Sequence, residues 1–335
     1  MIFRQYDLHS FNLLIDCENT SDAKNIIRFD RLLLSKSIDV IKTDKPFVTI
    51  SIRFEDKLLN KESGPNAAKV MITDDFFIEA DFNNKTPSIA YEKSLYLEFL
   101  EDGNSTISIS KVPDKIDQQI IDQFLVIALD YAAANHSQSL FHAACILLPN
   151  KKSVVLIHAP SGTGKTTTSL ALTSLGYCII SDDACGIFCS ADMTMPEAWG
   201  IPRATKVHKK TIEFMKELIG FVHSNAWDNA DEQFIERDAL ISAGYMADAG
   251  LLPVKAIIEL QRDMSKPASI EKIDKFDTLK GLLEDNFCCV NGQIFPSHNS
   301  RMNIFGELVK KVDSYRLNVN ASPIEIAQII DKELR

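Results

Sequence analysis

The apolar run Val154–Ile157, followed by His158, leads directly into the glycine-rich segment Ala159-Pro160-Ser161-Gly162-Thr163-Gly164-Lys165-Thr166. This segment matches the permissive phosphate-loop pattern, in which Ala or Gly is followed, after any four residues, by Gly-Lys-Thr or Gly-Lys-Ser. The residues from Thr168 to Leu175 read as a helix, and Gly176 is a typical helix stop. Strand, glycine-rich loop and helix in this order predict a βαβ unit of an α/β domain.

The residue types in this loop suit a nucleotide such as ATP. Gly162 and Gly164 let the backbone approach the phosphates closely, so that its N–H groups form an anion-binding nest. Lys165 is predicted to reach the β- and γ-phosphates, and the Thr166 hydroxyl to bind Mg²⁺. The structural alternative is a glycine-rich turn before a buried helix, but such a turn does not select Lys and then Thr at the first helical positions.

Two adjacent carboxylates follow the next strand. The strand from Tyr177 to Ile180 runs into Ser181, Asp182 and Asp183. Because a crossover helix sets this strand parallel to the loop strand, its carboxyl end lies at the edge of the sheet where ligands bind. One Asp is predicted to hold Mg²⁺ and the other to accept a proton from an attacking hydroxyl, with the assignment left open. A solvated turn is the alternative reading.

His142 lies in a predicted strand, residues 140–148, that turns at Pro149–Lys152 into the loop strand. Two strands joined by so short a turn pair antiparallel. A lone His in an apolar strand is more often a core residue, but this strand borders the loop strand, which makes His142 a catalytic candidate.

A basic segment follows at residues 201–216, which contain five Lys and Arg residues and only one acidic residue, Glu213. Arg203 and Lys206 are predicted to contact phosphate, and the other three lysines are assigned to the solvated face of a helix over residues 205–218. The predicted catalytic residues are Asp182, Asp183, His142 and Lys165, and the predicted metal ligands are Thr166, Asp182 and Asp183. The predicted nucleotide contacts are Ser161, Gly162, Thr163, Gly164, Lys165, Thr166, Thr167, Arg203 and Lys206.

The segment from Phe141 to Asp183 resembles the catalytic domain of the HPr kinase/phosphorylase family. The shared order is a His that opens a strand, a short hairpin, the loop, a helix that ends in Leu-Gly, and an acidic pair. The resemblance implies a P-loop domain of the type shared with ATP-dependent phosphoenolpyruvate carboxykinase, and phosphoryl transfer from Mg²⁺·ATP to a serine hydroxyl. The Glu-x-Arg-Gly-Leu-Gly signature of those kinases has only a distant likeness here, at residues 197–201. HPr itself is therefore not the expected acceptor, and a peptide, a protein or free serine stays open.

The remaining sequence predicts two domains. Residues 1–113 read as a smaller mixed α+β domain, rich in β, for recognition or scaffolding, with an alternating strand over residues 48–54 and a hairpin over residues 95–111. Residues 114–335 read as the catalytic α/β domain. That domain adds a helix over 116–134, strands over 252–260 and 315–317, and a final helix that a capping box starts at Ser322.

Composition excludes several classes of function. Lys and Arg total 36 against 46 Asp and Glu, a net charge of −10, which disfavours nucleic acid as a partner. No signal peptide or membrane-spanning stretch is expected, and seven cysteines without a C-x-x-C pair fit a reducing cytoplasm. A homo-oligomer is compatible with the sequence. Two further readings stay open, a small-molecule carboxykinase or nucleotide hydrolase of the same fold, and a regulatory module that senses ATP without turnover.

Overall fold

The computed structural model describes residues 2–17, 44–55, 67–73, 76–82, 85–92, 94–110, 118–160, 162–201, 204–224, 226–286, 289–290 and 293–335. The chain forms two compact units, unit 1 (Met1–Ser139 and Phe287–Asn303) and unit 2 (Leu140–Asn286 and Ile304–Arg335). This division differs from the boundary predicted after residue 113, because helix α3 (Gln118–Ala134) packs against strands β3, β7 and β8 of unit 1.

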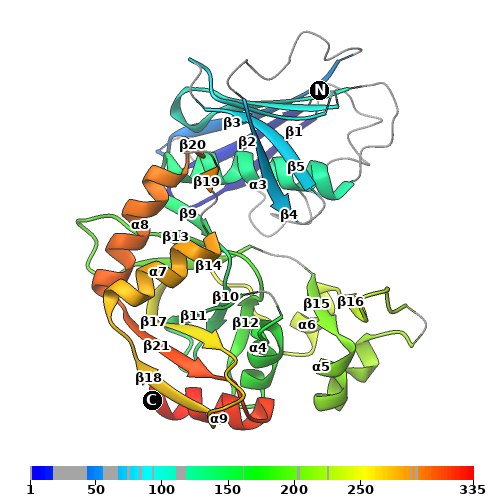
Figure 1. Cartoon of the computed structure of the whole chain (residues 1–335), viewed down its shortest axis with the longest axis vertical. Coiled ribbons are helices and arrows are strands. Elements are labelled where there is room, and N and C mark those ends of the chain that lie inside the picture. The colour runs from blue at the N-terminus through cyan, green and yellow to red at the C-terminus, as the bar shows by residue number, and fades with distance from the viewer. Residues whose placement is uncertain are drawn as a thin grey trace. The chain divides into compact units, whose positions relative to one another are not determined.

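Unit 1 contains an eight-stranded sheet, of which Figure 1 labels β1 to β5. The strand order is β1-β2-β3-β8-β7-β6-β5-β4. Strand β3 is parallel to both of its neighbours, β2 and β8, and the other pairs are antiparallel. The strands are β1 (Ile2–Asp7), β2 (Asn12–Cys17), β3 (Phe47–Glu55), β4 (Ala68–Thr73), β5 (Phe76–Asp81), β6 (Ser88–Tyr91), β7 (Leu95–Phe99) and β8 (Ser105–Ser110). A 3₁₀ turn, η2 (Glu101–Gly103), joins β7 to β8, and β19 (Cys289–Val290) pairs with β20 (Gln293–Ile294).

The alternating pattern of the sequence accounts for the strands of unit 1. Every second residue of β3 is buried, from Val48 to Phe54, and the residues between them are more exposed. The hairpin predicted over residues 95–111 is confirmed, since β7 and β8 pair antiparallel. Helix α3 buries the apolar side chains Ile121, Phe124, Leu125, Ala128, Leu129, Ala132 and Ala133.

Unit 2 contains most of a nine-stranded mixed sheet. Its main order is β12-β10-β11-β17-β14-β13-β9, and β21 pairs with both β17 and β18. The strands are β9 (Gln138–Phe141), β10 (Ala144–Leu147), β11 (Val154–His158), β12 (Cys178–Ser181), β13 (Cys185–Phe188), β14 (Glu197–Gly200), β17 (Leu252–Gln261), β18 (Ser269–Lys272) and β21 (Asp313–Asn318). Strands β15 (Thr205–His208) and β16 (Glu232–Ile235) form a separate ribbon.

Helices cover both faces of the central strands of unit 2, which gives a layered α/β architecture (Figure 1). Helices α4 (Lys165–Thr173) and α9 (Pro323–Leu334) pack on one face, and α7 (Lys275–Asn286) and α8 (His298–Lys311) contribute to the other. The remaining helices are α5 (Lys209–Phe214), η3 (Lys216–Phe221) and α6 (Arg237–Ser242). The predicted capping box at Ser322 is confirmed at the start of α9.

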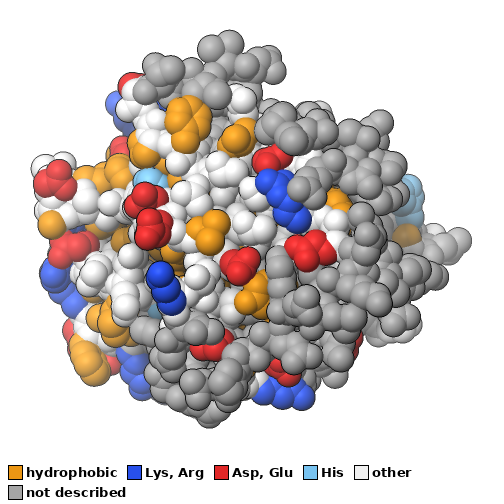
Figure 2. Space-filling model, turned by 90° about the horizontal axis from the view of Figure 1, so that it is seen from above, with side chains coloured by type: hydrophobic (Ala, Val, Ile, Leu, Met, Phe, Trp, Pro, Cys, Tyr) orange, Lys and Arg blue, Asp and Glu red, His pale blue; other side chains and the backbone are white. Residues whose placement is uncertain are grey.

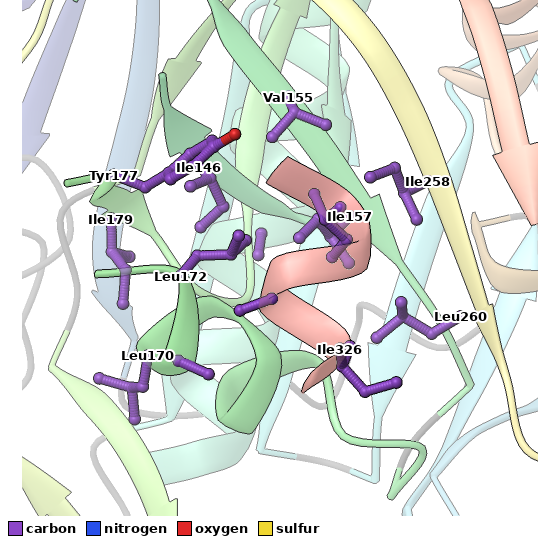
Figure 3. Packing of buried hydrophobic residues seen from close by; sticks show 14 of the residues in the cluster. Ile146, Val155, Ile157, Leu170, Leu172, Tyr177, Ile179, Ile258, Leu260 and Ile326 are labelled. Atoms are coloured by element: carbon purple, nitrogen blue, oxygen red, sulfur yellow. The ribbon is translucent and has the colours of Figure 1, made fainter. Parts of the chain in front are cut away.

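All five residues of β11 are buried, because the strand has neighbours on both sides and helices above and below. Its side chains alternate between the two helix layers, so that Val155 and Ile157 face α4 and α9 while Val154 and Leu156 face the α7 and α8 side. Figure 3 shows Ile157 within the first of these cores, with Ile326 of α9. Each such buried aliphatic side chain contributes about 1.5–3 kcal/mol through the hydrophobic effect, so the strand that carries the loop is firmly fixed.

Two local predictions are wrong. The single strand expected over residues 140–148 is broken at His142 and Ala143, where the Ala143 amide donates to the carbonyl of Phe141 and the chain passes from β9 to β10. The helix expected over residues 205–218 begins as strand β15, because residues 205–208 pair with β16, more than twenty residues further along the chain.

Within the part of the chain that the structure describes, no helix is long and apolar enough to cross a membrane. On the face shown in Figure 2, the coloured acidic and basic side chains are interspersed among apolar and neutral ones. Among the described side chains of that face, Lys and Arg do not form a continuous patch.

Candidate functional site

The topology of the sheet brings three separate motifs to one edge. Strand β10 lies between β11 and β12 and is antiparallel to both, so β11 and β12 run in the same direction. The glycine-rich loop follows β11 and the acidic pair follows β12, which places both at the carboxyl edge. Because β10 runs the opposite way, His142, which lies two residues before the start of β10, is at that same edge.

The glycine-rich loop, residues 159–166, connects β11 to α4. Gly162 and Gly164 have φ values of 77° and 119°, in the left-handed range that side chains with a Cβ rarely adopt. Gly164 is the N-cap of α4 and leaves the first turn of this helix without a side-chain cap. A Cβ built on Gly162 would meet nothing within 4 Å, so the loop is open on that side. Ser161 lies outside the described residues.

Lys165, His142 and Asp183 form a row beside the loop. The Nζ of Lys165 lies 2.7 Å from Nε2 of His142, and Nδ1 of His142 lies 3.4 Å from Oδ1 of Asp183. The same Asp183 oxygen is 3.9 Å from the lysine Nζ. An ammonium can only donate, so Nε2 of His142 accepts the bond and the ring proton resides on Nδ1, toward Asp183.

Burial is the largest influence on both basic groups of this row. It lowers the pKa of His142. The charge of nearby Lys165 lowers this pKa further, whereas the charges of Asp183 and Asp285 raise it. Burial also lowers the pKa of Lys165 against the attraction of Asp183, Asp285 and Asp182. His142 is therefore neutral at neutral pH, in agreement with its role as an acceptor from Lys165.

Thr166 and Asp182 form a second pair of the site. The Thr166 hydroxyl donates to Oδ2 of Asp182 over 3.4 Å, and Asp182 is buried with 4% of its surface exposed. A hydroxyl and a carboxylate side by side are oxygen ligands of the kind that Mg²⁺ prefers, since Mg²⁺ is usually bound by one or two carboxylates together with phosphates. The pair therefore fits the ion. Among the described residues, no group of three or more His, Cys, Asp and Glu side chains is arranged so that it could hold a metal ion without phosphate oxygens as further ligands.

The other predicted nucleotide contacts are placed as follows. Thr167 hydrogen-bonds Thr211 of α5 through the two hydroxyl groups, 2.8 Å apart, so it ties α4 to the neighbouring helix. Lys206 is half-exposed on β15 and forms an ion pair with Glu232 at 2.9 Å. Its contact with phosphate stays a prediction. Arg203 lies outside the described residues.

Four residues that the sequence did not single out adjoin these groups. His158 and Asp285 are paired, with Nδ1 and Oδ2 2.9 Å apart. Asn286 accepts a hydrogen bond from the backbone N–H of His142, and Arg262 donates from Nη2 to the carbonyl of Thr163 in the loop. Asp285 and Asn286 carry no local signal, because their partners are more than a hundred residues away in the chain. Arg262 comes directly after β17, the parallel neighbour of the loop strand, so its place in the sequence could have indicated that it lies near the loop.

No family model and no curated protein matches the chain. Among solved structures, the chain is similar to an HPr(Ser) kinase/phosphatase from Coxiella burnetii, at 13% sequence identity and a TM-score of 0.30. The match covers 58% of this chain and 95% of that chain. A similarity at this level carries no conclusion about function.

Proposed function

We propose that unit 2 is an ATP- and Mg²⁺-dependent kinase domain of the P-loop, HPr-kinase-like type, which transfers a phosphoryl group to a hydroxyl. One observation carries the proposal. At the end of a glycine-rich loop, the Lys165–His142–Asp183 row lies beside the Thr166–Asp182 pair, which supplies a cation for phosphates, oxygen ligands for Mg²⁺ and a carboxylate for a proton.

The donor side of the site uses the loop and the start of α4. The open backbone around Gly162 and the uncapped first turn of α4 offer N–H groups to the phosphates of ATP. Lys165 places its ammonium at the same end of the helix and neutralises charge on the terminal phosphate. Thr166 and Asp182 would hold Mg²⁺, which when bound supplies electrostatic stabilisation of the phosphates.

The acceptor side uses Asp183. The two carboxylates that the sequence could not tell apart have different surroundings, since Asp182 is buried against Thr166 while the Asp183 side chain is 45% exposed. Only the exposed carboxylate can meet an incoming hydroxyl, so we assign Asp183 as the general base. The hydroxyl proton passes to Asp183 as the acceptor oxygen bonds the terminal phosphorus. The bond from that phosphorus to the bridging oxygen breaks, and ADP leaves with the electron pair.

We assign a serine of a peptide or protein as the acceptor, on the resemblance of residues 141–183 to the HPr kinase/phosphorylase family. The N-terminal domain would serve in recognition or as a scaffold. Among the described residues Cys145, Cys178, Cys185 and Cys189 are free thiols, which supports a cytoplasmic location.

The test is phosphoryl transfer from γ-labelled ATP in extract of the native cell, with the full-length chain and with Asp183→Asn. We expect wild type to label a small number of acceptors on serine. Asp183→Asn should lower that labelling by about 100–10,000-fold, the range for loss of a general base, and should still bind ATP. Asp192→Asn, an exposed aspartate of the same unit, is the matched control. Label that appears only as inorganic phosphate, or transfer that Asp183→Asn leaves intact, would contradict the proposal.

A further inference from the structure

The last two residues of α7 contact the segments that carry the candidate site. Helix α7 contributes Leu282 to the apolar layer on the β11 face that bears Val154 and Leu156, and it ends at Asp285 and Asn286. The Oδ1 of Asn286 accepts from the backbone N–H of His142 over 2.7 Å. The other end of the same amide donates to the Leu282 carbonyl, 2.9 Å away, which fixes the side chain against its own helix. His142 is thereby held at the break between β9 and β10, where no strand pairing holds it.

Asp285 contacts the other strand of the site. Its Oδ2 lies 2.9 Å from Nδ1 of His158, the last residue of β11 and the one directly before the glycine-rich loop. His158 is 1% exposed, and its Nε2 is buried without a hydrogen-bond partner among the described residues. The carboxylate therefore keeps the ring proton on Nδ1 and is the polar contact that orients this buried ring.

Helix α7 lies against this ring. One turn before Asp285, a Cβ built on Gly281 would lie 3.4 Å from Cε1 of His158 and 3.5 Å from the carboxylate of Glu259, which are ordinary van der Waals distances. At Gly281 the helix is therefore in direct contact with His158 and Glu259. Glu259 is the partner of His158 in the β11–β17 register and is itself paired with Arg316 at 2.9 Å. The end of α7 thus lies on a polar row that crosses three neighbouring strands.

We propose that Asp285 and Asn286 are positioning residues of the reaction, which hold the loop strand and His142 so that Lys165, His142 and Asp183 keep their mutual geometry. Asn286 acts through the backbone of His142, and Asp285 acts through His158 on the start of the loop. The inference rests on the function proposed above. It assigns a role in turnover to two residues at the end of α7 that the proposed function does not itself use.

The first test compares the kinetics of the full-length chain with those of Asn286→Ala, Asp285→Ala and Asp285→Asn. A displacement of about 1 Å in a catalytic group can cost about 100-fold in rate, so we expect each Ala variant to lower kcat by about 10-fold or more. The KM for ATP should change by less than about 3-fold, because these hydrogen bonds hold His142 and His158 and leave the backbone N–H groups of the loop available. Asp285→Asn keeps an oxygen that accepts from Nδ1–H and should recover most of kcat. Glu284→Gln, an exposed neighbour paired with Lys280, is the matched control.

The second test needs no turnover. The chain has seven histidines, so the ¹⁵N signals of the imidazole rings can be assigned by single replacements. At fixed pH, Asp285→Ala should change the Nδ1–H signature of His158, and Asn286→Ala should shift the signals of His142. Asp285→Asn should keep the His158 tautomer, and Glu284→Gln should leave both rings unchanged.

The outcomes separate this inference from the proposed function. A wild-type chain that transfers no phosphoryl group contradicts the proposed function, and the ring signals still decide whether α7 fixes the two histidines. An active wild type whose Ala variants match Glu284→Gln in kcat and in ring signals overturns the positioning role. Parallel losses of kcat, ATP affinity and melting temperature without recovery in Asp285→Asn also overturn it, because they indicate a purely structural contact.

Discussion

Replacement of Lys165 by Met should strongly lower activity without destabilising the protein. The Lys165 side chain is only 10% exposed, and burial lowers its pKa despite the nearby carboxylates of Asp183, Asp285 and Asp182. A lowered lysine pKa means that the ammonium is less favourable in the folded chain than in the unfolded one. Met fills a similar volume without a charge. The free energy of unfolding should therefore stay constant or rise by up to about 2 kcal/mol, the range for removal of a functional strain.

The same replacement should lower kcat, and this loss should be larger in free energy than the effect on stability. Lys165 is the cation at the end of the loop, 2.7 Å from His142 and 3.9 Å from Asp183. Loss of one preorganised donor of this kind lowers kcat by about 100–1,000-fold. At about 1.4 kcal/mol for each tenfold, this is about 3–4 kcal/mol of transition-state stabilisation.

The assay pairs initial rates of phosphoryl transfer with thermal unfolding of the same samples, and the control is Lys152→Met in the exposed turn between β10 and β11. A change of 1 kcal/mol corresponds to about 2–4 °C in Tm for a unit of this size. We expect Lys165→Met to lose activity with a Tm equal to or above that of wild type. A fall in Tm of more than about 5 °C would refute the argument from burial, and a loss of activity below threefold would refute the catalytic role.

Three further outcomes are expected. Thr166→Val should raise the Mg²⁺ concentration for half-maximal activity by at least about 10-fold, because it removes one of the two proposed oxygen ligands; an unchanged Mg²⁺ titration contradicts this assignment. In unit 1, burial, aided by Arg301 and opposed by Asp130, lowers the pKa of His298 to about 4. Since the pKa of His298 is lower in the folded chain than in the unfolded one, its contribution to the free energy of unfolding is fully present above pH 6.5. This contribution is lost as the pH falls toward 4. Unfolding free energies of wild type should thus drop by about 2 kcal/mol more between pH 7 and pH 5 than those of His298→Gln, and parallel curves would argue against it. Ser322→Ala, which removes the capping box of α9, should cost about 1 kcal/mol of stability with activity unchanged, as measured by urea unfolding and initial rates.

The parts of the site that the sequence predicted are those whose partners are close in the chain. The loop, the short turn after β10 and the strand that ends at Ser181 all lie within residues 140–183, and their pairing follows from turn length and crossover alone. From this pairing, the convergence of His142, Lys165 and Asp183 could be foreseen.

The parts that were missed depend on distant partners. Residues 205–208 lie in β15 because of a pairing with β16, which no local pattern reveals, and α3 joins unit 1 through its contacts with β3, β7 and β8. Asp285 and Asn286 reach His158 and His142 across 127 and 144 residues of chain. The assignment of Asp183 rather than Asp182 as the general base required the exposed fractions of the two side chains, which differ only in the folded chain.

The antiparallel course of β10 has a practical consequence. The turn at Pro149–Lys152 joins β10 to β11 at the opposite edge of the sheet from His142 and the glycine-rich loop, and all four of its residues are exposed. Exposed turns of this kind are the usual places where chains accept insertions. A fluorescent or affinity label inserted there would leave the edge that carries the candidate site free, and it would report on unit 2 from the β10–β11 hairpin of that site.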